Sequence, residues 1–105
     1  MSWLYLVLAG ITEIGWPVGL KLAQSGQYKW LGIIMAISFM AISGTLLFFA
    51  QKTIPMGTAY AVWTGIGAAG TFLVGVFVYG DASSLVRYFG VFLILSGVVL
   101  LKVGH

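Results

Sequence analysis

The sequence has very few charged residues, and this scarcity decides its class. Charged residues make up 7% of the 105 residues and hydrophobic residues 61%, whereas an average soluble domain is roughly a quarter charged. So few charges cannot cover a water-facing surface, so most of the surface must face lipid. The net charge of +3 comes from bases that stand singly between apolar runs. No basic stripe exists, and we expect no nucleic-acid partner.

Other absences narrow the chemistry. The chain has no cysteine, which excludes disulfides, thiolate catalysis and cysteine metal sites. The sequence also shows no metal-binding set, no nucleophile–base pair and no phosphate-binding loop. We therefore predict that the protein is not an enzyme and needs neither a cofactor nor a metal. The first residues, MSWLYLVLAG, lack the basic region of a signal peptide, so we interpret them as a retained span.

Long apolar runs make up most of the chain. A spanning helix needs about 20 mostly apolar residues, and the sequence contains four such runs, at approximately residues 3–22, 30–50, 57–79 and 85–103. Short connections containing glycine, proline and serine separate them. The prediction is a single all-α transmembrane domain over residues 1–105, arranged as a small antiparallel bundle of four helices.

Positive charge hardly distinguishes the two sides of this domain. Lys21, Lys29 and Arg87 belong to one side of the membrane, and Lys52 and Lys102 belong to the other. Loops on the cytoplasmic side normally carry an excess of such residues. So small a difference fits one weakly favoured orientation, and it fits equally well the insertion of copies in opposite orientations that then pair as an antiparallel dimer.

The fourth span offers a surface for pairing. Gly90, Ile94 and Gly97 recur at helical spacing, and small residues let helices approach closely. The same residues would also suit packing within one chain, and the sequence leaves both interpretations open. Two copies would supply enough helices to enclose a central chamber, which one chain of four helices cannot easily do.

Glu13 is one of only two acids, and it lies near the middle of the first span. A carboxylate at mid-bilayer costs roughly 2.5–3.5 kcal/mol on insertion scales, and such residues usually mark an ion or substrate path. Every base lies near a span end, where it cannot easily reach Glu13. Gly10, Trp16 and Pro17 share its helix face. Gly10 would leave space, Trp16 offers an indole donor, and Pro17 should kink the helix because it cannot donate to the Glu13 carbonyl.

The second and third spans carry polar and aromatic residues that would suit a site around Glu13. Ser43 lies deep enough to reach a mid-membrane group, although hydroxyls in membrane helices more often bond to their own backbone. Tyr60 and Trp63 share one face of the third span. They fit such a site, and they also fit the aromatic belt at the membrane surface.

Four stretches of the sequence carry a family resemblance: SWLYLVLAGITEIGW, PMGTAYAVWTGIGAAG, GVFLILSGV and LLKVGH. With them the chain resembles, over nearly its full length, the small multidrug resistance transporters, and among these the guanidinium-exporting subtype. The third-helix stretch is the most specific of the four, and GVFLILSGV is similar to the family's dimerisation pattern.

The resemblance implies a dual-topology, antiparallel homodimer in a bacterial inner membrane. It also implies proton-coupled export, in which protons and substrate compete for Glu13 of both subunits. Carried over residue by residue, the residues lining the site are Gly10, Trp16, Ser43, Tyr60 and Trp63. The first loop, LAQSGQYKW, is slightly longer than is usual in homodimeric members, so a pair of two different subunits is the alternative.

The substrate expected from the resemblance is guanidinium or a small guanidinyl cation. Its planar N–H fork matches the two oxygens of a carboxylate. The alternative is the export of quaternary ammonium or other hydrophobic cations, which would rely on charge and aromatic walls. A proton-carrying rotor subunit also holds one carboxylate at mid-membrane, but such subunits are normally two-span hairpins in large rings. A purely structural membrane subunit would tolerate the loss of Glu13.

Overall fold

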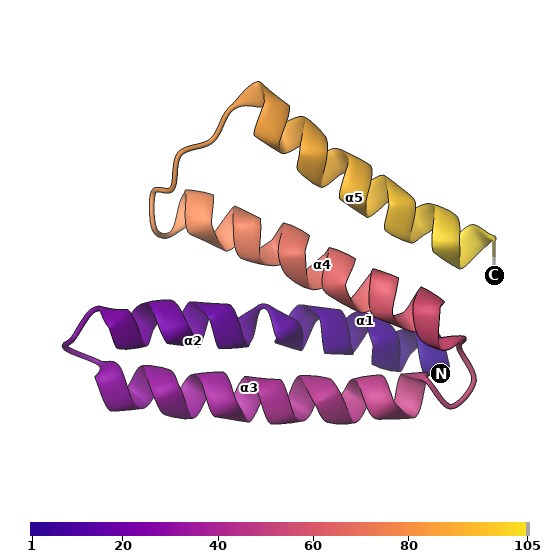
Figure 1. Cartoon of the computed structure of the whole chain (residues 1–105), viewed down its shortest axis with the longest axis horizontal. Helices are drawn as coiled ribbons and strands as arrows, with labels where there is room; N and C mark the ends of the chain where they lie inside the picture. The colour runs from indigo at the N-terminus through magenta and orange to yellow at the C-terminus, as the bar shows by residue number, and fades with distance from the viewer. Residues whose placement is uncertain (105) are drawn as a thin grey trace.

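The computed structural model describes residues 1–104, in which helices alternate with short connections. The helices are α1 (Ser2–Glu13), α2 (Gly15–Gln24), α3 (Lys29–Ala50), α4 (Met56–Phe77) and α5 (Leu85–Val103) (Figure 1). Because α1 and α2 follow one another along nearly one line, they form a single span, Ser2–Gln24. The described residues thus contain four helical segments long and apolar enough to cross a membrane, and the predicted all-α class is confirmed.

The third span ends earlier than the sequence suggested, at Phe77 instead of residue 79. Gly80 adopts a φ of 69°, a left-handed conformation that glycine accepts at little cost and that commonly ends helices. The amide of Asp81 then donates back to the carbonyl of Gly75 at 2.9 Å. The connection to α5 is therefore folded over the end of α4 instead of running straight out.

The helices form a flat array instead of a closed bundle. The α1–α2 span lies antiparallel to α3, α4 packs against α1, and within residues 1–104 the backbone of α5 lies close only to that of α4 (Figure 1). The molecule measures 44 × 34 × 17 Å, and one helix with its side chains is about 10–12 Å across. One chain is thus too thin to surround a chamber.

Glycine allows the backbones of two spans to come into contact. A Cβ atom added to Gly19 of α2 would lie 2.8 Å from the carbonyl oxygen of Gly32 on α3. The two backbones therefore touch, as small residues permit in membrane helices. This contact holds α2 tightly against α3.

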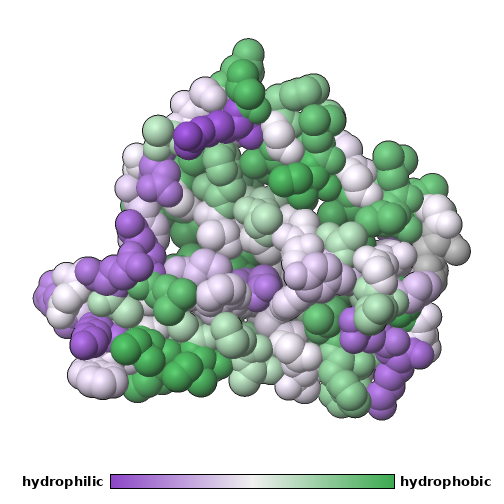
Figure 2. Space-filling view, in the orientation of Figure 1, coloured by the Kyte–Doolittle hydropathy of each residue, from purple (hydrophilic) through white to green (hydrophobic). Residues whose placement is uncertain are grey.

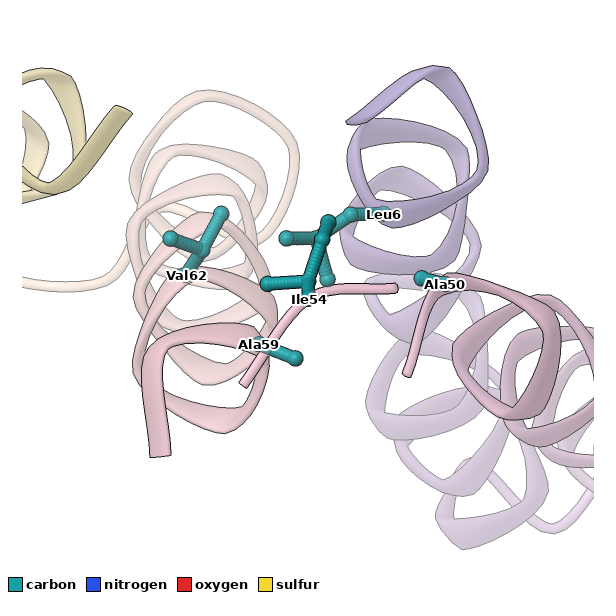
Figure 3. Close-up of a cluster of buried hydrophobic side chains, with 5 residues drawn as sticks. All are labelled: Leu6, Ala50, Ile54, Ala59 and Val62. Carbon is teal, nitrogen blue, oxygen red and sulfur yellow. The ribbon is translucent and has the colours of Figure 1, made fainter. Parts of the chain in front are cut away.

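A small apolar core holds the other end of the array together. Its buried residues come from α1, the end of α3, the following connection and the start of α4: Leu6, Ala50, Ile54, Ala59 and Val62 (Figure 3). None of the residues of α5, all of which the structure describes, is buried. In Figure 2 hydrophilic residues gather toward the ends of the array, and much of the surface between them is apolar. Such a surface suits contact with lipid or with another membrane-embedded chain.

Candidate functional site

Glu13 lies where the first span is interrupted. Helix α1 ends at Glu13 and α2 begins at Gly15. The amide of Ile14 donates to Ile11 at 3.2 Å, a tighter turn than that of an α-helix. Pro17 has no amide hydrogen for the Glu13 carbonyl. The interruption lies one turn before Pro17, next to the carbonyl that the proline leaves without its helical partner.

The indole of Trp16 holds the carboxylate of Glu13. Its Nε1 donates a hydrogen bond to Oε1 of Glu13, and both side chains are half-buried. This bond orients the acid and uses one of its oxygens. An indole can only donate, so it suits the ionised form of a carboxylate, which can only accept.

The Glu13 side chain packs directly against Gly67. A Cβ atom added to this buried glycine of α4 would lie 2.6 Å from Cγ of Glu13. Any larger residue would therefore displace the acid. Gly67 is not among the site residues that we predicted, although it shares the helix face of Tyr60 and Trp63. The available signal was its position one turn after Trp63, within the glycine-rich stretch GIGAAG.

Glu13 faces a groove between the first span and α4. The groove has a volume of about 440 Å³ and is lined by α1, α2, α4 and the connection after α4. Its polar lining residues are Glu13, Trp16, Thr64, Thr71 and Asp81. No lysine or arginine among residues 1–104 lines it. A cation that enters this groove therefore meets no fixed positive charge on its walls.

Ser43 joins three helices by hydrogen bonds. This residue of α3 is 1% exposed. Its hydroxyl donates to the carbonyl of Ala9 on α1 at 2.7 Å and accepts from Nε1 of Trp63 on α4 at 2.8 Å. By contrast, Thr45 on the same helix bonds back to its own backbone, at Ala41. Ser43 therefore does not follow the commoner behaviour of membrane hydroxyls.

The remaining predicted site residues lie at the margins of this arrangement. The ring of Tyr60 lies 5.5 Å from that of Trp63 and is tilted by 56°, while the residue is 58% exposed. Gly10 is buried, and a Cβ atom added there would lie 2.7 Å from Cβ of Ile66. Gly10 therefore serves the close approach of α1 to α4, and not the free space beside Glu13 that we expected.

Two groups of residues emerge, and helices α1 and α4 connect them. Glu13, Trp16 and Gly67 make the first, and Ser43, Trp63 and Tyr60 make the second. Each group contains one tryptophan, whose indole donates to an acceptor of its own group. One chain thus brings together most of the predicted site residues of its first three spans, without Gly10, and it does so in two neighbouring groups instead of one closed pocket.

The predicted pairing residues of α5 lie outside both groups. No described atom beyond the helix itself lies within 4 Å of a Cβ atom added to Gly90 or Gly97. Ile94 is 41% exposed. The two glycines therefore do not pack within the chain, which was one of the two interpretations that the sequence allowed.

Comparisons with known proteins match nearly the whole chain. The family profile described as "Small Multidrug Resistance protein" matches residues 1–94. A protein named guanidinium exporter from Yersinia pestis is 45% identical over 102 residues, which cover 97% of each chain. A guanidinium exporter from Salmonella typhimurium strain LT2 is 44% identical over 97% of this chain and 96% of its own length. One from Proteus vulgaris is 43% identical over 97% of each chain.

Proposed function

The chain belongs to the small multidrug resistance family, and we propose that it exports guanidinium and small guanidinyl cations in exchange for protons. It is a multi-pass membrane protein of the transporter class, and the bacterial inner membrane fits its relatives. The observation that carries the proposal is the placement of Glu13. This carboxylate lies in the middle of a span, faces a groove that no basic residue among residues 1–104 lines, and is held by an indole donor.

The groove offers what a planar cation with several N–H donors needs. Trp16 donates to one oxygen of Glu13, so the second oxygen and the remaining lone pairs can accept from a guanidinium group. The indole ring of Trp16 also lines the groove. A cation over such a ring gains about 0.5–2 kcal/mol, depending on how dry the site is.

Coupling to protons follows from the use of one carboxylate for both ligands. A proton on Glu13 removes the negative charge that attracts the cation, and a bound cation disfavours the proton. By linkage, each ligand weakens the binding of the other by the same factor. If the site opens to one side of the membrane at a time, protons entering the cell drive the cation out.

Access to both sides requires a second copy in our proposal, arranged antiparallel to the first. One chain is a flat array, its groove is open, and α5 has free space beside Gly90 and Gly97. A second copy in the opposite orientation would cover α5, close the groove and add a second Glu13. By symmetry, its inward-open and outward-open states would be equivalent. A pair of two different subunits would serve in the same way, and the mass and composition of the purified complex would distinguish the two assemblies.

Proton release from purified protein tests this function directly. Adding guanidinium to weakly buffered protein in detergent should release protons, because the cation displaces them from Glu13. The Glu13→Gln variant should release none and should show no guanidinium-driven proton movement in vesicles. Proton release that persists in this variant would refute the role of Glu13.

Hydrophobic quaternary ammonium cations are the second candidate substrates. Trp16, Ala68 and Phe72 give the groove apolar walls, which such ions need because they have no N–H donors. Competition between guanidinium and a tetraalkylammonium ion in the same vesicles separates the candidates. Hydrogen bonding to Glu13 should favour guanidinium, and tighter binding of the tetraalkylammonium ion would reverse the assignment.

A further inference from the structure

The only two acids of the chain line the same groove. Glu13 lies within the first span and Asp81 lies in the connection between α4 and α5, yet both contribute to the groove of about 440 Å³. No base among the described residues lines it. The groove therefore joins a carboxylate in the middle of a span to one at the membrane surface, and both attract positive charge.

The backbone fixes Asp81 over the end of α4. The positive φ of Gly80 turns the chain back, and the amide of Asp81 donates to the carbonyl of Gly75 at 2.9 Å. Gly75 has no side chain, and an added Cβ atom would overlap Oδ2 of Asp81. The carboxylate thus occupies the place where a side chain of α4 would otherwise stand.

Asp81 does not cap the start of α5, although it lies close before that helix in the sequence. Aspartate and serine residues just before a helix commonly cap it, and Asp81, Ser83 and Ser84 all lie just before α5. In the structure Ser84 is the cap, and its hydroxyl accepts from the amide of Arg87 at 3.3 Å. The carboxylate of Asp81 is thus left for another role.

Two bases have side chains in the region of Asp81, and within residues 1–104 neither forms an ion pair with it. The guanidinium group of Arg87 donates to the carbonyl of Ala82 at 2.9 Å. Lys21 lines a smaller neighbouring cavity of about 180 Å³, which also contains Asp81, Thr71 and Pro17. Within residues 1–104, Lys21 forms no ion pair with Asp81.

We propose that Asp81 forms a second, outer binding station for guanidinium-like cations at the mouth of the groove. The inference rests on the function proposed above. Asp81 is exposed and lies in the connection outside the spans, so it meets the cation first, and its carboxylate can pair with the N–H fork. From there the cation moves past Thr71, which lines both cavities, to Glu13. A cleft of one charge sign with apolar walls raises the local concentration of its ligand. In an antiparallel pair, each membrane face would carry one such station.

The test compares guanidinium uptake by the full-length protein and its Asp81→Asn variant in vesicles. Removing the outer charge should raise the guanidinium concentration needed for half-maximal uptake by about tenfold at low ionic strength. The rate at saturation should stay within about twofold, because Glu13 remains. Since the Debye length falls to about 3 Å at 1 M salt, the difference between the two proteins should largely disappear there.

Two matched variants test whether the position of the carboxylate matters or only the net charge of the connection between α4 and α5. Asp81→Glu should keep the wild-type half-saturation value and its salt dependence. The double variant Asp81→Asn with Ser83→Asp keeps the net charge of the loop, but moves the acid to a residue that lines neither cavity. It should behave like Asp81→Asn. Wild-type behaviour of the double variant would overturn the proposal.

Exchanging the two charges tests whether Asp81 instead has a structural role through an ion pair with Lys21. The double variant Lys21→Asp with Asp81→Lys would still allow such an ion pair, but it would place a lysine over the groove. We expect it to be at least as impaired in half-saturation as Asp81→Asn, and recovery of wild-type uptake would overturn the proposal. So would an Asp81→Asn variant with unchanged half-saturation, or one that loses only its rate at saturation.

Failure of the outer station and failure of the proposed function give different results. If wild-type protein takes up guanidinium and Glu13→Gln does not, the proposed function stands whatever Asp81→Asn does. If wild-type protein shows no guanidinium uptake and no proton release, the proposed function itself fails and the outer station fails with it.

Discussion

The first three spans and the fourth have similar compositions, but the first three pack tightly against one another and the fourth does not. Helices α1, α3 and α4 bury residues against one another and are linked by the bonds of Ser43. Helix α5 is as apolar and also contains glycines, yet buries none of its described residues. Lipid is as apolar as leucine, so hydrophobicity alone does not bring membrane helices together. Hydrogen bonds between helices hold the first region together, whereas our proposal assigns the open face of α5 to a second copy.

The largest expected effect comes from replacing Gly67, against which the Glu13 side chain packs, by a larger residue. In Gly67→Val the new side chain would occupy the space of Glu13 Cγ. We expect the guanidinium concentration needed for half-maximal proton release to rise at least about 100-fold. A reacting or binding group that is misplaced by about 1 Å can lose about that factor. The same substitution at Gly44, where an added Cβ atom meets no described atom within 4 Å, is the control. Equal losses in both variants would contradict the assigned role of Gly67.

The matching change on α5 should affect assembly first. Gly97→Leu places a large side chain on the surface that we assign to the second copy. We expect the protein to shift from dimer to monomer in detergent, as measured by light scattering. The tryptophan fluorescence of the first three spans should stay close to that of the wild type. A dimer of unchanged stability would remove α5 as the pairing surface.

A smaller effect is expected from removing the hydroxyl that links three helices. Ser43→Ala leaves Nε1 of Trp63 and the Ala9 carbonyl without their shared partner. Hydrogen bonds between membrane helices contribute about 0.6 kcal/mol on average and up to about 1.7 kcal/mol. The midpoint of thermal unfolding in detergent should fall by a few degrees. Thr45→Val, which removes only a bond within α3, should change it less, and the reverse order would argue against the network.

The smaller of the two expected effects on cation binding concerns the indole donor to the acid. Trp16→Phe keeps an aromatic wall in the groove but removes the bond to Glu13. A hydrogen bond to a charged group contributes about 1.5–3 kcal/mol when it is buried, and the half-buried setting should reduce this. We expect guanidinium to bind several-fold more weakly in a proton-release titration, with little change for tetraalkylammonium ions. Equal weakening of both ligands would indicate that the ring, and not the donor, matters.

Much of the fold followed from local features of the sequence. Apolar runs and breakers are local, so they located the four spans, and helical spacing placed Trp16 beside Glu13. The partner of Ser43 did not follow, since a hydroxyl bonds to its own backbone or to a neighbouring helix depending on which faces pack together. For the same reason Gly10 was assigned to open space, whereas it packs against Ile66.

The flat arrangement and the position of Asp81 were also beyond the reach of sequence patterns. Four antiparallel apolar helices fit a closed bundle and an open array equally well, because lipid can cover whichever side is left exposed. Asp81 reaches the groove through the turn at Gly80 and the missing side chain of Gly75. Its place in the sequence, just before Ser83, Ser84 and α5, is instead typical of a helix cap.

The thinness of the array, 17 Å in its shortest dimension, has a consequence for activity in a bilayer. A slab of this kind has two faces and no enclosed chamber, so in our proposal a sealed compartment exists only where two slabs meet. Turnover per chain should then depend on how crowded the chains are, and should fall by mass action as lipid is added. For such a protein the surface density in the membrane takes the role that concentration has for a dissociating complex in solution.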